Sequence, residues 1–363
     1  MQPPSEAAVP TFQITEETIS PAFTDEWEAL VYNVGGSFFQ SPQWVRAWQK
    51  AYAPEAPLLA LTARDADGAL VGTFVLAELT RAVHRYAPLP LAYLGVAGSG
   101  AGSADRLGPL AESEDLARAL FHAALGARPG RSVLLESLGP LAPPEVEGAL
   151  TKTATCPVAD LSDVEAVKAL WSRKTRKNNR RHRRKAEDAG LSLRWYEPGE
   201  ATADVLKGIG ALHIARQQTL GRSGLFDEQR LRVLQAIGEG RYRDSDGLWV
   251  STLTDASGVI RAGLMGFQYA GGFYEYKTGW DPDYYEVSPG KVLKTNSIER
   301  AIDGGLSRYE FLRGTESYKF RLGGENRPDT TVLVPRGAAG RLLAIRERFG
   351  AEATEHADEE SSD

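Results

Sequence analysis

The sequence is poor in cysteine and histidine. Its 363 residues include one cysteine, Cys156, and five histidines. A single cysteine cannot form an internal disulfide, so a reducing, cytoplasmic location is expected. Cys156 precedes Pro157 at an expected strand end, where a buried apolar role is favoured over a nucleophilic one. The histidines do not have the spacing of metal ligands, and no metal site is predicted.

Long apolar runs are absent as well. No window approaches about 18 apolar residues, so no membrane-spanning helix is predicted. The first residues, MQPPSEAAVPTF, do not have the form of a signal peptide. The composition is ordinary for a globular protein, with 42% hydrophobic and 25% charged residues and a net charge of −6. The length predicts two domains, placed at 1–150 and 151–350, before an acidic tail, 351–363, that is expected to be disordered.

Two hairpin patterns lie at matching places in the two halves. LLALTAR and ALVGTFVLAEL flank the turn 65–68, and LWVSTLT and VIRAGLMGFQY flank the turn 255–258. The turns are 255 − 65 = 190 residues apart, and Gly68 and Gly258 supply the positive φ that a tight hairpin requires. A strand, a helix and a strand are expected after each hairpin, which favours duplication. The first half also has a glycine-rich loop, 95–102, interpreted as a flexible lid over the second half's site.

Two helix starts have the same form. In 38–44, Ser41 is the expected N-cap and Pro42 the first helical residue, and the tryptophans that follow are interpreted as packing residues. In 273–319, a strand and a turn-rich loop precede Ser288 and Pro289, and a helix is expected to run to about residue 302 before a second strand. The start of this helix, with a glycine and a lysine, suits an anion such as a phosphate. An ordinary strand–helix–strand crossover explains the same pattern, so both interpretations stay open.

Three strings in the second half carry a resemblance: Y-x-x-x-S-P-G-x-x-L, I-x-x-A-x-x-x-G and Y-x-F-L-x-G-x-x-x-Y-K-F. They resemble the acyl-CoA-binding core of the GNAT superfamily, in the branch of CelD/BcsL-like acetyltransferases of bacterial exopolysaccharide clusters. That branch is related to the Fem-type aminoacyl transferases. The usual GNAT phosphate loop is richer in glycine than this one. The matching residues are Tyr285, Ser288, Pro289, Gly290, Leu293, Gly305, Gly314, Tyr318 and Lys319.

The resemblance implies an α/β fold with mixed sheets, made of tandem GNAT-like domains of which the C-terminal one retains the acyl-CoA site. It implies direct transfer of an acyl group, acetyl or longer, from acyl-CoA to an amine acceptor such as an amino sugar or amino-acid derivative. Tyr318 matches the acid that protonates the leaving thiolate, and Glu275 is the candidate base. His213, in an L-H-x-x-R pattern, is a candidate base or acceptor-site residue.

Binding roles follow from the same resemblance. The residues expected at the cofactor are Lys277, Thr278, Gly279, Ser288, Pro289, Gly290, Lys291 and Leu293. The residues expected at the acceptor are Arg216, Arg222 and Lys319.

A strongly basic segment, 173–185, has nine Lys or Arg and one His in thirteen residues. It is expected to continue a helix that begins at a capping box of Ser162 and Glu165. The cations fill one side of this helix, about 200° wide, while Thr175, Asn178 and His182 lie on the other. The candidate polyanion-binding residues are Arg173, Lys174, Arg176, Lys177, Arg180, Arg181 and Arg184.

Three interpretations of the cationic side remain open: a solvated surface, a site for a polyanion such as RNA, tRNA or an anionic membrane, and contact with the phosphates of coenzyme A or a nucleotide-linked acceptor. For the whole protein, two alternatives to acyl-CoA-dependent transfer stand. One is a Fem-like aminoacyl-tRNA-dependent transferase, and the other is a non-catalytic polyanion-binding protein of the same fold.

Overall fold

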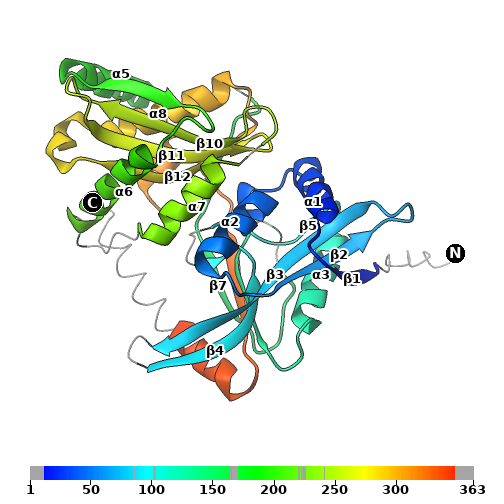
Figure 1. Cartoon of the computed structure of the whole chain (residues 1–363). Helices are drawn as coiled ribbons and strands as arrows, with labels where there is room; N and C mark the ends of the chain where they lie inside the picture. The colour runs from blue at the N-terminus through cyan, green and yellow to red at the C-terminus, as the bar shows by residue number, and fades with distance from the viewer. Residues whose placement is uncertain are drawn as a thin grey trace, which may run out of the picture.

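The computed structural model describes residues 12–84, 87–100, 104–139, 141, 143–163, 165, 171–219, 221, 226–240 and 242–347. They form two mixed sheets, each covered by helices, in two lobes (Figure 1). Arg222 and the expected acidic tail lie outside the described residues. No described helix is long and apolar enough to cross a membrane.

The first sheet has the strand order β1-β2-β3-β4-β6-β15-β7, and β5 pairs with β3. Its strands are β1 (Ile14–Glu17), β2 (Leu58–Arg64), β3 (Leu70–His84), β4 (Ala87–Val96), β5 (Leu110–Ala111), β6 (Ser132–Leu138), β7 (Leu150–Ala154) and β15 (Asp329–Val334). Its helices are α1 (Pro21–Asn33), η1 (Phe38–Gln40), α2 (Pro42–Tyr52) and α3 (Glu114–Gly126).

The second sheet has the order β14-β8-β13-β12-β11-β10-β9. Its strands are β8 (Pro157–Asp160), β9 (Ser192–Tyr196), β10 (Gly247–Thr254), β11 (Ile260–Tyr269), β12 (Gly272–Trp280), β13 (Arg308–Glu310) and β14 (Glu325–Asn326). The associated helices are α5 (Arg173–Asp188), α6 (Ala203–Thr219), α7 (Glu228–Gly238), η3 (Pro282–Val287), α8 (Pro289–Asp303) and α9 (Ser317–Arg321).

The two faces of the second sheet have separate cores. Leu264 and Phe273 pack with α8 residues, including Leu293, and with Ala186 of α5. The opposite face packs with α6 and α7 and is continuous with the core of the first half. Figure 1 shows α5 and α8 on the outer side of this sheet and α6 and α7 on the side of the other lobe.

The expected duplication is confirmed in the fold. The order β1-α1-α2-β2-β3-β4-α3-β6 in the first half matches β9-α6-α7-β10-β11-β12-α8-β13 in the second. Both hairpin turns end in a glycine with φ of +86°. In each turn the Asp carboxylate, of Asp65 or Asp255, accepts N–H groups two and four residues later. The repeated sequence therefore gives a repeated local structure.

The closing strands of the two halves are exchanged. β7 stays at the edge of the first sheet, but β8 crosses to the second; β14 stays at the edge of the second sheet, but β15 crosses back to the first. The sheets therefore do not follow the expected division into 1–150 and 151–350. The chain crosses between the lobes twice, near residue 156 and near residue 328.

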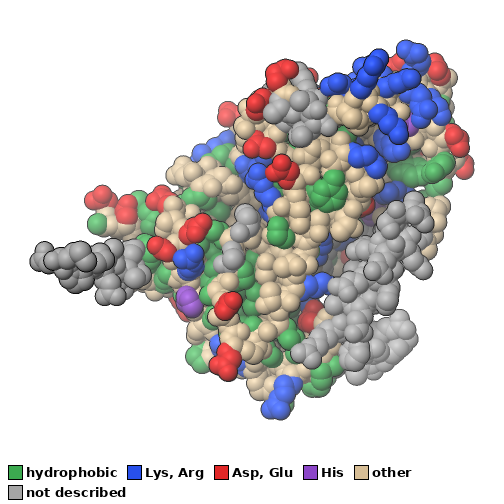
Figure 2. Space-filling model, turned by 180° about the vertical axis from the view of Figure 1, so that it is seen from behind, with side chains coloured by type: hydrophobic (Ala, Val, Ile, Leu, Met, Phe, Trp, Pro, Cys, Tyr) green, Lys and Arg blue, Asp and Glu red, His purple; other side chains and the backbone are tan. Residues whose placement is uncertain are grey.

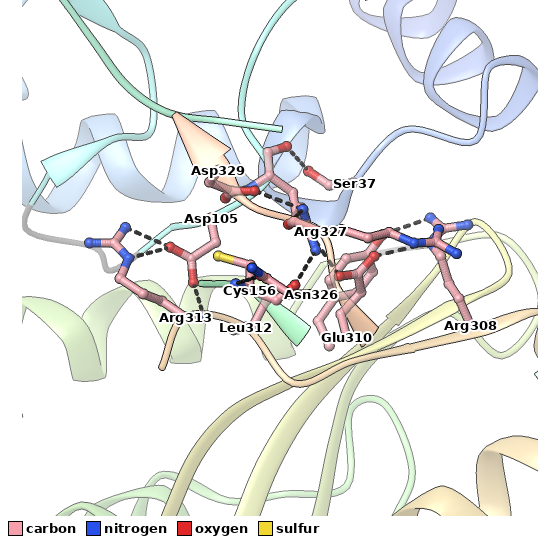
Figure 3. Close-up of polar contacts among 12 residues, drawn as sticks. Ser37, Asp105, Cys156, Arg308, Glu310, Leu312, Arg313, Asn326, Arg327 and Asp329 are labelled. Atoms are coloured by element: carbon pink, nitrogen blue, oxygen red, sulfur yellow. Dashed lines mark hydrogen bonds and ion pairs between the residues drawn. The ribbon is translucent and has the colours of Figure 1, made fainter. Parts of the chain in front are cut away.

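A buried ionic cluster lies at these crossings (Figure 3). Arg106 donates to Glu310 at 3.0 Å, to Asp329 at 2.8 Å and to the carbonyl of Cys156 at 2.7 Å. Asp105 accepts two hydrogen bonds from the Arg313 guanidinium, at 2.6 and 3.1 Å. The side chains of Asp105, Cys156 and Asp329 are the one set of possible metal ligands in the described ranges. Since arginines already engage both carboxylates, ion pairing accounts for this cluster.

Two expectations are corrected by the tertiary contacts. Residues 95–99 are buried rather than a flexible lid, because the indoles of Trp44 and Trp48 donate to the carbonyls of Gly98 and Ser99, each at 3.0 Å. The basic helix does not continue from a capping box at Ser162. It begins at Arg173, and the Ser172 hydroxyl accepts from the Thr175 amide at 3.0 Å.

Candidate functional site

The candidate site lies where β12 and β13 separate. The two strands pair in parallel only through 272–274 and 308–310. A β-bulge interrupts the pairing of β12 with β11, because Gly266 pairs with Glu275 and Met265 with Lys277, so that Tyr276 is the extra residue. Beyond Tyr274, the edge of β12 that faces β13 therefore has no ladder partner in the described strands. Apart from the Thr278 carbonyl, which lies 3.0 Å from His213 Nδ1, backbone groups on this edge are candidates for contact with a ligand.

A buried polar network lies beside this gap on the α8 face. The carboxylate of Glu275 contacts the Lys294 ammonium at 2.6 Å and accepts from the Tyr318 hydroxyl at 3.2 Å. Its second oxygen accepts from Tyr309 at 3.0 Å. Tyr318 also accepts a hydrogen bond from Lys294. The structure thus brings together the predicted pair Tyr318 and Glu275, and it adds Lys294 and Tyr309.

The network sets the protonation of its members. Burial and the neighbouring Glu275 carboxylate raise the pKa of Tyr318 well above its usual range, so the phenol keeps its proton. Burial lowers the pKa of Lys294, although the Glu275 carboxylate opposes that effect. A protonated phenol that contacts an ion pair can give up a proton and recover it locally.

The network opens into a pocket of about 470 Å³ between α5, α8 and α9. This volume is in the range of small-ligand sites, roughly 300–1,000 Å³. Its lining residues are Ser172, Lys174, Thr175, Asn178, Asn179, His182, Lys291, Lys294, Thr295, Tyr318, Phe320, Arg321 and Leu322.

Comparisons with known proteins give the family of this region. Residues 173–320, which include α5, the β12–β13 gap and most of α9, match a family model described as "Acetyltransferase (GNAT) domain". This segment is a GNAT domain. No curated protein matches the sequence.

Solved structures share the fold of the whole chain. FemX aligns with a TM-score of 0.61 at 11% identity, over 88% of this chain and 96% of its own. The C-terminal domain of a putative lysylphosphatidylglycerol synthetase from Agrobacterium fabrum aligns at 0.54 and 13% identity, over 91% and 96%. L-PGS from Bacillus licheniformis aligns at 0.52 and 12%, over 92% and 97%. At these identities the likeness concerns the fold alone.

The start of α8 in the GNAT domain differs from the expectation. Ser288 precedes the helix in a left-handed conformation, with φ of +56°, and its side chain makes no capping hydrogen bond. Gly290 faces the Trp280 ring, where a Cβ atom would lie 3.2 Å from Cδ1. Pro289 and Leu293 are buried in the helix, and Leu293 belongs to the core. Among these five residues only Lys291 lines the pocket.

The acceptor-side candidates lie on the opposite face of β12. His213 Nδ1 lies 3.0 Å from the Thr278 carbonyl, and burial lowers the pKa of His213 to about 4. Gly279 permits this close approach of α6, because a Cβ atom there would lie 2.4 Å from the His213 backbone nitrogen. The Arg216 guanidinium lies 5.7 Å from the Trp280 ring. The sheet therefore separates His213 from Tyr318 and Glu275, whereas Arg216 reaches Trp280, which packs with the core on the α8 face.

Lys277 is the other charged residue at the bulge. Its ammonium lies 5.3 Å from the ring of Tyr276, which packs in the core shared by the two halves. The structure records no hydrogen bond or ion pair between this ammonium and any described residue. Burial, and then the nearby Arg230, lower the pKa of Lys277 to about 8. A substantial fraction of this amine is therefore neutral near physiological pH.

Lys319 does not have the predicted freedom to bind a substrate. Its ammonium donates to the carbonyls of Leu312 and Arg313, at 3.0 and 2.7 Å, and pairs with Glu316 at 3.0 Å. These three partners account for its three N–H groups. Lys319 therefore holds the loop that follows β13.

The predicted cationic helix exists as α5, and its cations are exposed. Figure 2 shows Lys and Arg side chains gathered over this end of the molecule. All seven predicted polyanion-binding residues are exposed, whereas Arg183, which the prediction left out, pairs with Glu299. The helix is attached to the domain through His182 and Ala186, its buried residues.

Sequence reasoning missed two members of the network. Lys294 lies at i+3 from Lys291 and turns toward the sheet, among residues such as Leu293 and Ile298 that form the core. A lysine at a sheet-facing position of a helix was the available signal, because a buried lysine requires a partner. Tyr309 lies on a three-residue strand, where alternation is too short to show which face it occupies.

Proposed function

We propose that the protein is an N-acyltransferase that moves an acyl group from acyl-CoA to an amine acceptor by direct attack. One observation carries this proposal: the unpaired edge of β12 lies beside the Tyr318–Glu275–Lys294 network, and that network opens into a pocket of suitable size. A GNAT family match over the same residues supports it.

The face of the second sheet that is covered by α8, called here the donor face, would supply the acid. With the thioester carbonyl at the open edge of β12, backbone N–H groups there stabilise the developing negative charge. The acceptor nitrogen forms a bond to the carbonyl carbon, the carbon–sulfur bond breaks, and the thiolate takes the Tyr318 proton. The Lys294–Glu275 pair then returns a proton to the tyrosine. Glu275 is thus assigned to the proton relay, because its carboxylate is already paired on the donor face.

The opposite face of the sheet, which is turned toward the first half and is called here the acceptor face, would supply the base. Lys277 and His213 lie on the face of β12 that is turned toward the first half, and both are largely or partly neutral at pH 7–8. Lys277 has the better-matched pKa, since general bases work best near the operating pH. The acceptor class we propose is an amino sugar or an amino-acid derivative, and the proposed setting is cytoplasmic exopolysaccharide synthesis.

The test combines binding and turnover. Calorimetry with acetyl-CoA and longer acyl-CoAs measures donor affinity, and release of free thiol with a panel of amino sugars and amino acids measures transfer. Tyr318→Phe should lower kcat by about 10²–10⁴-fold, the usual contribution of a general acid, with donor Kd changed less than about threefold. Tyr52→Phe, at the end of α2 and outside the matched GNAT segment, is the control. Absence of donor binding, or full turnover by Tyr318→Phe, would overturn the proposal.

A second function is favoured by one observation, the exposed cations of α5. They would suit an aminoacyl-tRNA donor or a non-catalytic polyanion partner. Binding of bulk tRNA that falls steeply between 50 and 200 mM salt, without any acyl-CoA binding, would favour it.

A further inference from the structure

The bulge in β12 decides which way Lys277 points. Side chains alternate along a strand, and Glu275 pairs with a lysine of α8, so regular pairing would turn Lys277 toward α8 as well. Instead Tyr276 is the extra residue, and Lys277 pairs with Met265 of β11. Paired residues of antiparallel strands share a face of the sheet, and Met265 packs in the core shared by the two halves. Lys277 therefore lies on the acceptor face.

The Lys277 amine lies at the gap between β12 and β13. Its charge is influenced by Arg230 of α7. It is also influenced by Arg313 and Lys319, which follow β13 along the chain, and by Asp105, to which the Arg313 guanidinium donates at 2.6 Å. This stretch of β12 has no ladder partner on the side of β13 in the described strands. The amine is therefore beside the backbone groups that we propose for the thioester carbonyl.

Lys277 differs from two other lysines near the gap. Lys294 pairs with Glu275 at 2.6 Å. Lys319 donates to two backbone carbonyls and pairs with Glu316. The Lys277 ammonium has no hydrogen bond or ion pair in the part of the chain that the structure describes, and its residue is half-buried. A lysine that is desolvated beside another cation is the kind that acts as a nucleophile.

We infer that Lys277 is a self-acylation site, whose amine takes the acyl group when a donor is bound and no acceptor is present. Its Nζ atom forms a bond to the thioester carbon, and the carbon–sulfur bond breaks. The nitrogen loses one proton and the thiolate gains one from Tyr318, so the products are an amide and a free thiol. This inference rests on the proposed function in one respect, because it requires an acyl-CoA donor.

Acylation of Lys277 changes the acceptor face in two ways. It removes a positive charge. It also replaces the proposed base with an amide, which cannot take a proton from an incoming amine. The protein would therefore stop transferring acyl groups when donor is present without acceptor. Transfer to added amino sugars or amino acids should fall in proportion to the acylated fraction.

The first experiment is mass spectrometry of the intact protein and of its peptides after incubation with acetyl-CoA in an amine-free buffer. We expect an acetyl group on Lys277, and none at that position in Lys277→Arg. The exposed Lys207 of α6 is the internal control, because it reports chemical acetylation by free acetyl-CoA. Tyr318→Phe should slow acetylation of Lys277 by about 10²–10⁴-fold and leave Lys207 unchanged, since only the enzymatic reaction requires a general acid. The thermal midpoints of both variants check that they are folded.

The pH dependence of acetylation is a second readout. The charged and titratable groups around the Lys277 amine are Arg230 of α7, His213 of α6, Tyr276 of its own strand, Asp105, Arg313 and Lys319. Burial, and then Arg230, lower the pKa of Lys277 to about 8, so the rate should rise about tenfold per pH unit below 8 and level off above it. A rate that keeps rising to about pH 10, as for a lysine of ordinary pKa, would contradict the inference.

The outcomes separate this inference from the proposed function. If thiol release with amino sugars or amino acids proceeds and Lys277 stays unmodified without them, the inference is wrong and the function stands. If acetyl-CoA does not bind, or binds and acetylates neither an added amine nor Lys277, both are wrong. Equal acetylation of Lys277 in the unsubstituted protein and in Tyr318→Phe would make it a chemical modification and overturn the inference.

Discussion

Two lysines on β12 and α8 differ in their partners, and that difference separates the two faces of the site. The Lys294 ammonium forms an ion pair with the Glu275 carboxylate at 2.6 Å, so the carboxylate stabilises the positive charge of Lys294 on the donor face. Among the described residues no carboxylate forms an ion pair with Lys277, and burial beside Arg230 lowers its pKa to about 8, although Asp105 opposes that effect. A buried ion pair stabilises a proton donor nearby, whereas an uncompensated amine releases its proton easily. The residue environments therefore give one face acidic and the other basic character.

His213 makes the protein's stability depend on pH. Its pKa is about 4 in the folded protein, against about 6.5 in the unfolded chain. Between these values the unfolded chain binds the additional proton, so the free energy of unfolding falls as the pH drops from 6.5 to 4. The loss attributable to this residue is roughly 3 kcal/mol. Urea unfolding of His213→Gln should show a correspondingly shallower pH dependence.

The exposed His122 is the matched control for this measurement. His122→Gln should keep the full pH dependence. A His213→Gln profile that superimposes on the unsubstituted protein would show that His213 is not buried as a neutral imidazole.

Residue patterns predicted part of the site. The Tyr-Lys pair at the end of the third motif identified Tyr318, and the position of Glu275 on an expected strand identified Glu275. The Tyr318 hydroxyl does donate a hydrogen bond to Glu275. The local sequence does not predict that Lys319, next to Tyr318, points away from Glu275. Its ammonium instead donates to carbonyls of the preceding loop. Neighbouring residues on a helix face different directions. Their roles therefore depend on how a five-residue helix is oriented, which the sequence does not show.

At the scale of elements, the contact between α6 and β12 depends on glycine. A Cβ atom at Gly279 would lie 2.4 Å from the His213 nitrogen and 2.7 Å from the Ile209 carbonyl, both of them backbone atoms that cannot move independently. Gly279→Ala should therefore destabilise the protein by about 1–3 kcal/mol, as overpacking does. It should also weaken the His213–Thr278 hydrogen bond, measured as a further fall in the His213 pKa, because that hydrogen bond opposes the effect of burial.

Gly208 on the same helix is the matched control. A Cβ atom there meets only the Ile260 side chain, at 4.0 Å. Gly208→Ala should stabilise the protein by up to about 1 kcal/mol, because alanine is the better helix former. Equal effects of the two substitutions in urea unfolding would contradict the packing argument.

Element boundaries show where local signals mislead. Ser162 and Glu165 have the spacing of a capping box, yet Ser172 caps the basic helix. Ser288 precedes a proline as a capping serine does, yet it adopts a left-handed conformation at the end of η3. In the first case another serine caps the helix, and in the second the serine makes no capping hydrogen bond. The pattern therefore predicts each helix but not the way in which it starts.

At the scale of the whole molecule, the duplication was visible in the sequence and the strand exchange was not. The repeated hairpins are local, and a turn such as 65–68 can be read directly. β8 and β15 pair with strands far away in the sequence, and β15 has only six residues. Short strands fit either sheet by pattern alone. The exchange is fixed instead by long-range contacts such as that of Arg106 with Glu310, at 3.0 Å.

This exchange should make the two halves unfold together. Each sheet contains a strand from the other half, and Arg106 links Glu310 of the second sheet to Asp329 of the first-sheet strand β15. Arg106→Met removes the cation paired with Asp329 and leaves Glu310 with only the longer contact to Arg308, at 3.6 Å, so it should cost about 3–5 kcal/mol. Hydrogen exchange can be followed against urea concentration in peptides from β3 of the first sheet and β11 of the second. Both peptides should show the same midpoint urea concentration of unfolding, and Arg106→Met should lower that midpoint in both sheets. Arg118→Met, at a surface pair 59% exposed, should leave it in place. Two separate midpoints, or a loss confined to one sheet, would mean that the halves are independent and that the exchange does not couple them.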